Sequence, residues 1–273
     1  MPLFADIPFA LLAISFALCL LVSALGFRRV DWFISLGYGF SIAAQAVLFL
    51  ITYRATNSVW VIVQALLLLA YGLRLGIYLT MRERSPSFAR ELAASKERSA
   101  GINGPVKVLI WISVSALYVA MASPVLFAME AEAGGIALWS LPVGIVLMIL
   151  GLATEALADW QKARFKAQFP SRFASHGLYR IVRYPNYFGE MLFWFGLLVS
   201  GIAAYQSILA WLIALAGCVC IQLIMIGSAR RLEIKQGERY GDDADYQAFT
   251  RSVPALIPLI PLYSVRNAKI YLG

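Results

Sequence analysis

The sequence is poor in the residue types that build metal centres and disulfide scaffolds. It has a single histidine, His176, and only three cysteines in 273 residues. Without further histidines, no His/Cys/carboxylate group has the spacing of a metal site. The cysteines, Cys19, Cys218 and Cys220, all lie in apolar runs and do not suggest a disulfide framework. We therefore expect neither a bound metal nor disulfide bonds.

The sequence also lacks the common nucleotide-binding and hydrolase motifs. It contains no Walker motif and no G-x-S-x-G elbow. The segment Gly37-Tyr38-Gly39 is not a dinucleotide fingerprint, because no strand precedes it and no βαβ unit is expected here. The first apolar run is long enough to span a membrane, so we do not expect a cleavable signal peptide.

Charged residues are scarce, and apolar residues take their place. Charged residues make up 14% of the chain and hydrophobic residues 61%, with a mean hydropathy of +0.75. Soluble domains are usually about half apolar. The net charge of +8 is compatible with nucleic-acid binding, but the basic residues are distributed as in a membrane protein. We therefore expect an integral membrane protein with no nucleic-acid partner.

Several apolar segments have the roughly 20 residues that a membrane-spanning helix needs. They predict an all-α, polytopic protein with seven spans, of which the sixth and seventh form a tight helical hairpin. A further apolar segment, Ala255–Tyr263, is too short to span and is expected to pack against the bundle or lie in the interface. The predicted spans are about Pro8–Phe27, Trp32–Tyr53, Val59–Thr80, Val108–Met129, Ile136–Thr154, Tyr187–Tyr205 and Gln206–Gly227.

The basic residues alternate between the two sides of these spans. Apart from Arg54 and Arg74, every Lys and Arg falls in the first, third or fifth loop or in the C-terminal tail. The third loop, for example, carries Arg82, Arg84, Arg90, Lys96, Arg98 and Lys107. The positive-inside rule then places the N-terminus outside and the C-terminus in the cytoplasm.

Four polar residues follow one face of the third predicted span. Tyr71, Arg74, Tyr78 and Arg82 have helical spacing, so each lies within about 60° of Tyr71 around the helix. An arginine inside a span usually faces a cavity or a partner. Alternatively, Arg74 reaches along the helix to the inner interface.

Acidic residues near the other spans also allow two interpretations. Glu155, Asp159, Lys162 and Lys166 continue the fifth span as one polar stripe, which either binds a ligand or forms intrahelical ion pairs. Asp31 opens the second span and either has a task there or pairs with Arg28 or Arg29. Gly37 and Gly39 in that span permit close helix contact.

The stretch from His176 to Glu190 combines arginines, tyrosines and a carboxylate at the start of the sixth span. Pro185 suits the first turn of a helix, where a missing N–H costs nothing. Asn186 and Glu190 share a helix face. A carboxylate entering a span needs a partner or a task. The alternative is an interfacial flank that holds basic residues and tyrosines and has no other role.

Four segments carry a resemblance to the membrane-embedded steroid 5α-reductase family, over about Tyr71 onward. The first reads HGLYRIVRYPNYFGE and is followed by MLFWFGLLVSG. The third span, YGLRLGIYLTMRERSP, resembles the family's third-span segment. Glu155–Lys166 falls where that family has a polar helix extension that contacts the cofactor. ALIP near the end is similar to the family's terminal motif.

The resemblance implies an NADPH-dependent reductase of a conjugated ketone, such as a 3-oxo-Δ4-steroid. It implies one membrane-embedded domain over residues 1–273, with substrate-side residues in 1–107 and most cofactor contacts in 108–273. A monomer in the bacterial inner membrane would take its lipophilic substrate from the surrounding membrane lipids. Tyr71 matches the tyrosine that donates a hydrogen bond to the substrate carbonyl. The family also has a carboxylate on the second span beside that tyrosine; no second-span acid of this chain matches it clearly, and Asp31 and Gln45 are the candidates for the position.

The resemblance, together with charge chemistry, also implies a set of cofactor-binding residues. Without a Rossmann fold, side chains must hold the phosphates, the carboxamide and the ribose hydroxyls of NADPH. The candidates are Arg74, Tyr78, Arg82, Arg84, Glu155, Asp159, Lys166, Arg172, Tyr179, Asn186, Glu190, Arg230, Arg231 and Tyr246.

Two other functional classes remain open. The tail residues Arg231, Glu233, Tyr240, Tyr246, Arg251 and Pro254 also resemble those of membrane methyltransferases of the isoprenylcysteine carboxyl methyltransferase type, which use S-adenosylmethionine. A lipid-binding protein or transporter is the third class. A transporter would more often place polar residues in broken helices at the midplane.

Overall fold

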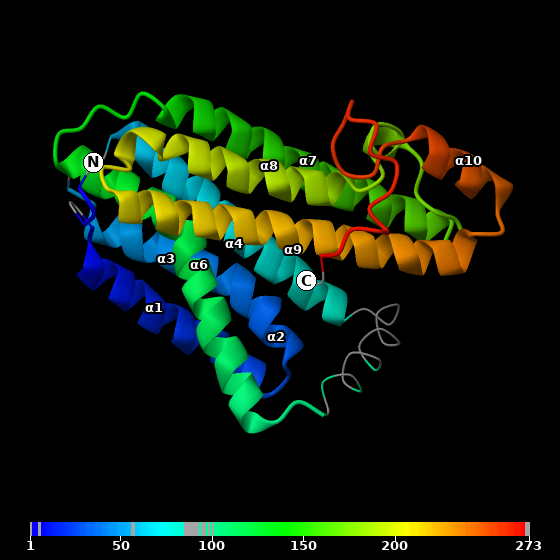
Figure 1. The fold of residues 1–273 in the computed structure, drawn as a ribbon, viewed down its shortest axis with the longest axis horizontal. Coiled ribbons are helices and arrows are strands. Elements are labelled where there is room, and N and C mark those ends of the chain that lie inside the picture. The colour runs from blue at the N-terminus through cyan, green and yellow to red at the C-terminus, as the bar shows by residue number, and fades with distance from the viewer. Residues whose placement is uncertain are drawn as a thin grey trace. The chain divides into compact units, whose positions relative to one another are not determined.

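The computed structural model describes residues 2–4, 7–55, 58–84, 93, 97, 99 and 101–270 (Figure 1). These residues form helices, turns and irregular segments, and no strand is found among them. The helices are α1 (Phe9–Ser23), α2 (Asp31–Ile34), α3 (Leu36–Thr52), α4 (Val59–Glu83), α6 (Gly104–Ala133), α7 (Leu141–Gln168), α8 (Pro185–Ser200), α9 (Ile208–Tyr240) and α10 (Ala244–Ser252). Short 3-10 turns lie at η1 (Ala24–Phe27), η3 (Gly177–Arg180) and η4 (Ile202–Ala204).

Seven helical segments of the described chain are long and apolar enough to cross a membrane, which confirms the all-α, seven-span prediction. They are Phe9–Phe27, Asp31–Thr52, Val59–Glu83, Gly104–Ala133, Leu141–Gln168, Pro185–Ala204 and Ile208–Tyr240. Their orientation in the membrane stays a prediction. Three basic residues that support it, Arg90, Lys96 and Arg98, lie outside the described residues.

Two of the helices are much longer than their apolar segments. Helix α9 has 33 residues, or about 50 Å at about 1.5 Å per residue. The hydrocarbon core of a bilayer is only about 30 Å thick. The charged stretch after Gly227 therefore continues the seventh span as one helix. Helix α7 likewise runs without a break through Glu155–Lys166, as predicted.

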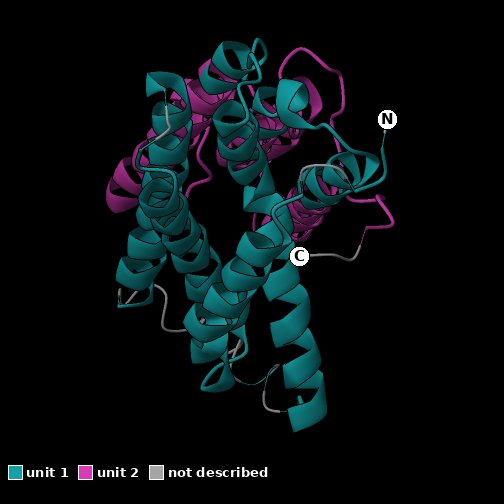
Figure 2. Ribbon diagram, turned by 90° about the vertical axis from the view of Figure 1, so that its left-hand side faces the viewer, with its two compact units in different colours: residues 1–145, 197–218 teal, residues 146–196, 219–273 magenta. Residues whose placement is uncertain are grey.

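The chain divides into two compact units (Figure 2). Unit 1 comprises Met1–Ile145 and Leu197–Cys218, and unit 2 comprises Val146–Gly196 and Val219–Gly273. Helices α7, α8 and α9 each contribute residues to both units. The expectation of a single membrane-embedded domain stays a prediction.

In unit 1, glycines bring α3 and α4 into close backbone contact. A Cβ added to Gly39 would lie 2.7 Å from the backbone nitrogen of Gly76, and one added to Gly72 would lie 2.6 Å from that of Ala43. Such distances leave no room for a side chain. This contact sets the register in which residues of α3 face residues of α4, and Gly39 takes part in it as predicted.

The second span is not one continuous helix, because it breaks at Ser35 between α2 and α3. A break inside a membrane frees backbone groups that need new hydrogen-bond partners. Beside this break, the Tyr118 hydroxyl of α6 donates to the carbonyl oxygen of Phe33 at 2.7 Å. The predicted span, Trp32–Tyr53, thus covers two helical pieces.

In unit 2, α7 and α8 pack antiparallel through two glycines. A Cβ on Gly189 would lie 2.5 Å from the backbone nitrogen of Glu155, and one on Gly151 would collide with the backbone nitrogen of Phe193. Since residue numbers rise along one helix as they fall along the other, the same register brings Asn186 level with Ala158. Helix α8 begins at Pro185, which confirms the sequence prediction.

The C-terminal segment of unit 2 packs against the turn before α8. The backbone N–H groups of Arg183 and Tyr184 donate to the carbonyl oxygens of Pro254 and Ala255 at 2.9 and 3.1 Å. Ala255 and Leu256 are buried in a cluster with Tyr184. The first part of the short apolar segment therefore packs against the protein, as one of the two predictions had it.

Candidate functional site

Tyr71 lies at the centre of a buried polar contact in unit 1. Its side chain on α4 is fully buried, and its hydroxyl lies 2.9 Å from the hydroxyl of Tyr38 on α3. The Tyr38 ring stacks on Tyr118 of α6, with ring centroids 5.4 Å apart. Three helices thus hold the two hydroxyls in place. The sequence analysis did not predict that Tyr38 would face Tyr71.

Gln45, one of the two candidates for the acid beside Tyr71, has a structural contact instead. It lies on α3, about two turns after Tyr38. Its side-chain amide donates to the carbonyl oxygen of Tyr118 at 3.1 Å and that of Ser41 at 3.4 Å. The bond to Tyr118 links α3 to α6 inside unit 1, and the bond to Ser41 lies within α3.

Asp31, the other candidate, belongs to an ionic group at the start of α2. Its carboxylate lies 3.6 Å from the Arg29 side chain, which also binds Glu83. The indole N–H of Trp32 donates to Glu83 at 3.0 Å. Glu83 lies about 18 Å beyond Tyr71 along α4. The prediction that Asp31 pairs with a neighbouring arginine is confirmed, and this pair belongs to the ionic group around Glu83.

The polar stripe of α4 runs from the buried part of the helix to its exposed end. Tyr71 is buried, Arg74 is half-buried, and Tyr78 and Arg82 are exposed. The Arg82 guanidinium lies 5.9 Å from the centre of the Tyr78 ring. Arg84 directly follows the helix and is exposed. The guanidinium groups of the stripe therefore lie in the C-terminal half of α4.

In unit 2, the α7–α8 contact brings together carboxylates and an amide. Glu155 and Glu190 are buried, while Asp159 and Asn186 are half-buried. Glu155 packs directly against Gly189, the neighbour of Glu190. Asn186 is level with Ala158 and therefore close to the turn of α7 that carries Asp159. The sequence had placed these residues on two separate helices, and the glycine contact is what gathers them.

Lys166 and Tyr179 make contacts within their own part of unit 2. The Lys166 ammonium donates to the Tyr240 hydroxyl at 2.9 Å and to the carbonyl oxygens of Pro170 and Arg172. These three acceptors use all three of its donors. The buried Tyr179 donates to the carbonyl oxygen of Ala158 at 3.3 Å. Both residues therefore hold the connection between α7 and α8, and Arg172 itself is exposed.

A buried ion pair of unit 2 joins two residues that the sequence did not predict as site residues. Arg183 is only 3% exposed, and its guanidinium donates to Glu233 of α9 at 3.0 Å and to the carbonyl oxygen of Tyr263. Glu233 also accepts from the backbone N–H of Val265 at 2.8 Å. In the sequence, Arg183 stood out only by its position two residues before Pro185, where α8 begins.

Of the three predicted tail residues, Tyr246 is buried, Arg230 bonds to the C-terminal segment, and Arg231 bonds within its own helix. Arg230 donates to the carbonyl oxygen of Arg266 at 3.1 Å, and the exposed Arg231 donates to Ser228 at 3.3 Å. Tyr246 of α10 is buried, and this burial raises the pKa of its phenol above the ordinary value. Tyr246 therefore stays neutral at physiological pH.

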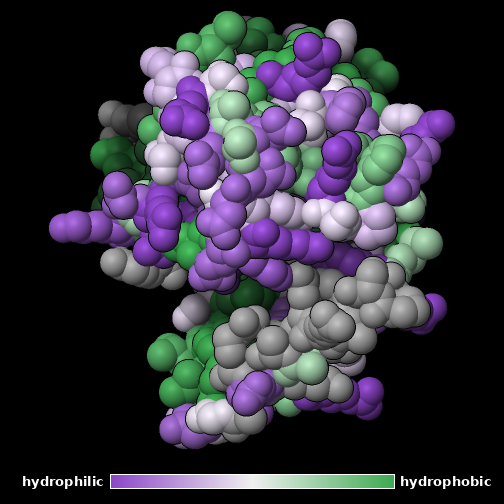
Figure 3. Space-filling model, turned by 90° about the vertical axis from the view of Figure 1, so that its right-hand side faces the viewer, coloured by the Kyte–Doolittle hydropathy of each residue, from purple (hydrophilic) through white to green (hydrophobic). Residues whose placement is uncertain are grey.

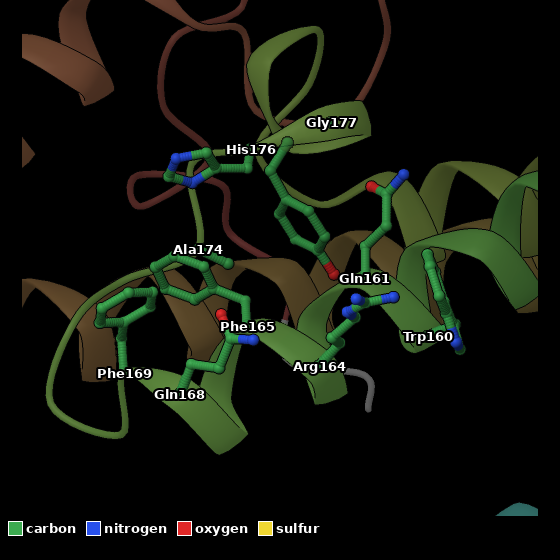
Figure 4. A pocket seen from close by; sticks show the side chains of 10 residues that line it. Trp160, Gln161, Arg164, Phe165, Gln168, Phe169, Ala174, His176 and Gly177 are labelled. Atoms are coloured by element: carbon green, nitrogen blue, oxygen red, sulfur yellow. The ribbon is translucent and has the colours of Figure 1, made fainter.

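An open pocket of about 350 Å³ lies between the end of α7 and the turn η3 in unit 2 (Figure 4). Figure 3 shows hydrophilic side chains gathered over the face that carries the ends of α7 and α9 and helix α10. The pocket lining comprises Trp160, Gln161, Arg164, Phe165, Gln168, Phe169, Ala174, His176, Gly177 and Tyr179. Of these, only Tyr179 was among the predicted site residues.

The donor set of unit 2 fits part of a dinucleotide. Carboxylates and an amide at the α7–α8 contact suit hydroxyl and carboxamide groups, which both donate and accept hydrogen bonds. Exposed guanidinium groups such as those of Arg172 and Arg231 suit phosphates. Lys166 fits a phosphate poorly, because its donors already have acceptors within the chain.

Comparison with known proteins places this chain in a family. The family model described as "Protein of unknown function (DUF1295)" matches residues 25–253. No curated protein and no solved structure matches the chain. The matched range contains Tyr38, Tyr71, the α7–α8 contact and the Arg183–Glu233 pair. The chain therefore belongs to the family described as "Protein of unknown function (DUF1295)".

Proposed function

We propose that this protein is a membrane reductase related to the steroid 5α-reductases, which reduces the C=C bond of a conjugated ketone with NADPH. The observation that carries the proposal is the buried hydroxyl pair of Tyr71 and Tyr38, 2.9 Å apart. A phenol is a neutral hydrogen-bond donor, so it can be buried between helices without a charged partner. The motifs around Tyr71 and Asn186 support the same reaction.

When bound at the α7–α8 contact, NADPH would supply the hydride that the β-carbon of the enone needs. The C=C π electrons then move toward the carbonyl, and negative charge develops on the carbonyl oxygen. Tyr71 donates its O–H to that oxygen, and Tyr38 donates to the Tyr71 oxygen, which makes Tyr71 a stronger donor. The α-carbon then takes a proton from water, so one C=C bond is reduced and NADP⁺ is released.

The α7–α8 contact is the proposed position for the polar groups of the cofactor. Asn186 offers an amide that matches a carboxamide, and Glu190 and Asp159 offer acceptors for ribose hydroxyls. The substrate would be a lipophilic enone, a steroid or another lipid, that enters from the bilayer of a bacterial inner membrane.

Ligand protection of the purified protein tests the cofactor. A ligand that binds only the folded state raises the melting temperature. We expect NADPH to protect the wild type, and Asn186→Ala and Glu190→Ala each to need about tenfold more NADPH for the same shift. The exposed Asn267→Ala is a matched control and should behave as the wild type. Protection by S-adenosylmethionine in place of NADPH would favour a methyltransferase and contradict the proposal.

Turnover of an enone steroid tests the tyrosine pair. Tyr71→Phe should keep NADPH protection but lose about 10²- to 10³-fold in kcat, as expected for the loss of one oxyanion donor. Tyr38→Phe should lose less, because it removes only the support of Tyr71. Normal turnover by Tyr71→Phe would show that Tyr71 is not the donor.

A further inference from the structure

We propose that the pocket between the end of α7 and the turn η3 binds the phosphate headgroup of an anionic phospholipid. Its lining shares only Tyr179 with the predicted cofactor-binding residues. Its volume, about 350 Å³, lies within the range of about 300–1,000 Å³ typical of ligand pockets. None of its ten lining residues is Asp or Glu.

The polar groups of the lining are arranged to donate to an anion. Arg164 carries a positive charge, and its guanidinium lies 5.4 Å from the centre of the Trp160 ring. In Figure 4, Arg164 lies between Trp160 on one side and Phe165 with His176 on the other. A guanidinium held against a ring suits bidentate contact with a phosphate.

Gln161 adds a second donor whose orientation is determined by its own hydrogen bond. The backbone N–H of Leu178 donates to Oε1 of Gln161 at 2.9 Å, so the amide nitrogen is the atom left to donate elsewhere. Gly177 has a φ of +61°, and a Cβ there would collide with Gln161. The glycine therefore allows the turn to close on Gln161.

The position of the pocket favours a lipid over a soluble phosphate. The apolar part of α7 ends near Thr154, so Trp160 lies about 9 Å farther along the helix, at about 1.5 Å per residue, beyond the hydrocarbon core. Trp160 is 56% exposed and Phe169 is 43% exposed. Large aromatic side chains exposed at the end of a span are typical of the membrane interface. Headgroup phosphates lie at this level.

The charge of the pocket also selects the type of headgroup. Arg164 repels a choline or ethanolamine ammonium but attracts a phosphodiester that carries no cation. His176, with its ring 5.1 Å from that of Phe165, adds an N–H donor at the rim. The favoured ligand is therefore a phospholipid with net negative charge, such as phosphatidylglycerol.

Thermal stability of the full-length protein in detergent micelles tests this site with four probes: phosphatidylglycerol, phosphatidylcholine, inorganic phosphate and NADP⁺. We expect phosphatidylglycerol to raise the melting temperature more than phosphatidylcholine does, and inorganic phosphate at equal concentration to have no effect. Arg164→Gln should need about tenfold more phosphatidylglycerol for the same shift. Arg164→Lys, which keeps the charge but loses the bidentate contact, should recover only part of the binding.

Arg180→Gln is the matched control, because Arg180 is an exposed arginine of η3 outside the lining. Its response to phosphatidylglycerol should stay within about twofold of the wild type. Equal protection of the wild type and Arg164→Gln by phosphatidylglycerol would overturn the proposal. Equal protection by the two lipids, or by inorganic phosphate, would overturn it too. If Arg164→Gln lost protection by NADP⁺ but kept protection by phosphatidylglycerol, the pocket would be a nucleotide site and the proposal would be overturned.

Discussion

Arg183 and Glu233 illustrate how single residues of the motif region hold unit 2 together. Their ion pair at 3.0 Å is nearly fully buried, and each partner also binds a backbone group of the C-terminal segment, at Tyr263 and Val265. A charge in such a place needs its partner, since desolvation of an unpaired ion costs several kcal/mol. The motif arginine is thus tied to α9 and to the tail at once.

Removing one partner of this pair should destabilise the protein strongly. We expect Glu233→Ala to lower the free energy of unfolding by about 3 kcal/mol, because it leaves the Arg183 charge buried. Glu238→Ala removes an exposed carboxylate from the same helix and should change it by less than about 0.5 kcal/mol. Unfolding by dodecyl sulfate in mixed micelles measures both. Equal stability of the two variants would mean that the pair contributes nothing.

At the scale of the elements, the contact between α7 and α8 decides where the polar side chains of unit 2 meet. Gly151 and Gly189 let the two backbones approach so closely that no side chain fits between them. Glu155, Asp159, Asn186 and Glu190 gather only because of this register. Close packing through small residues is typical of helices in membranes.

Adding one methyl group at this contact should separate the helices. We expect Gly189→Ala to lower the free energy of unfolding by about 1–3 kcal/mol and to weaken protection by NADPH, since its Cβ would lie 2.5 Å from the Glu155 backbone nitrogen. Gly237→Ala is the control, because a Cβ there meets nothing within 4 Å. Gly237 lies in the last turn of α9, so this substitution should be neutral or stabilising by less than about 1 kcal/mol. Stability of Gly189→Ala equal to the wild type would contradict the close contact.

For the whole molecule, the distribution of basic residues predicts how the chain crosses the membrane. The turn between α6 and α7 carries Gly135 and follows the acidic Glu130 and Glu132, while the turn between α9 and α10 follows Arg239. By the positive-inside rule, the first turn lies outside and the second lies in the cytoplasm. In this predicted orientation, the proposed site for a soluble cofactor would lie on the cytoplasmic side.

Labelling with a membrane-impermeant maleimide tests this orientation in intact cells. In a background without the native cysteines, Gly135→Cys should react and Asp242→Cys should react only after the cells are opened. The two positions serve as controls for each other, because each should be exposed on its own side. The reverse pattern would place the C-terminus outside and the proposed cofactor site on the wrong face.

Local features of the chain were enough to predict the class of fold and several details of the site region. Apolar runs of sufficient length predicted seven spans, because the bilayer requires about 20 apolar residues whatever the neighbouring helices do. The start of α8 at Pro185 and the continuation of α7 through Lys166 were also predicted from local features. Proline geometry and helical periodicity depend only on residues close in sequence.

Only the tertiary structure decided which side chains meet. Nothing local in the sequence indicates that Tyr38 faces Tyr71, that Ser35 interrupts the second span, or that Arg183 reaches Glu233. These contacts depend on which helix faces pack together and in what register. Close approach at glycines sets that register through contacts between residues far apart in the chain, and hydropathy does not record such contacts.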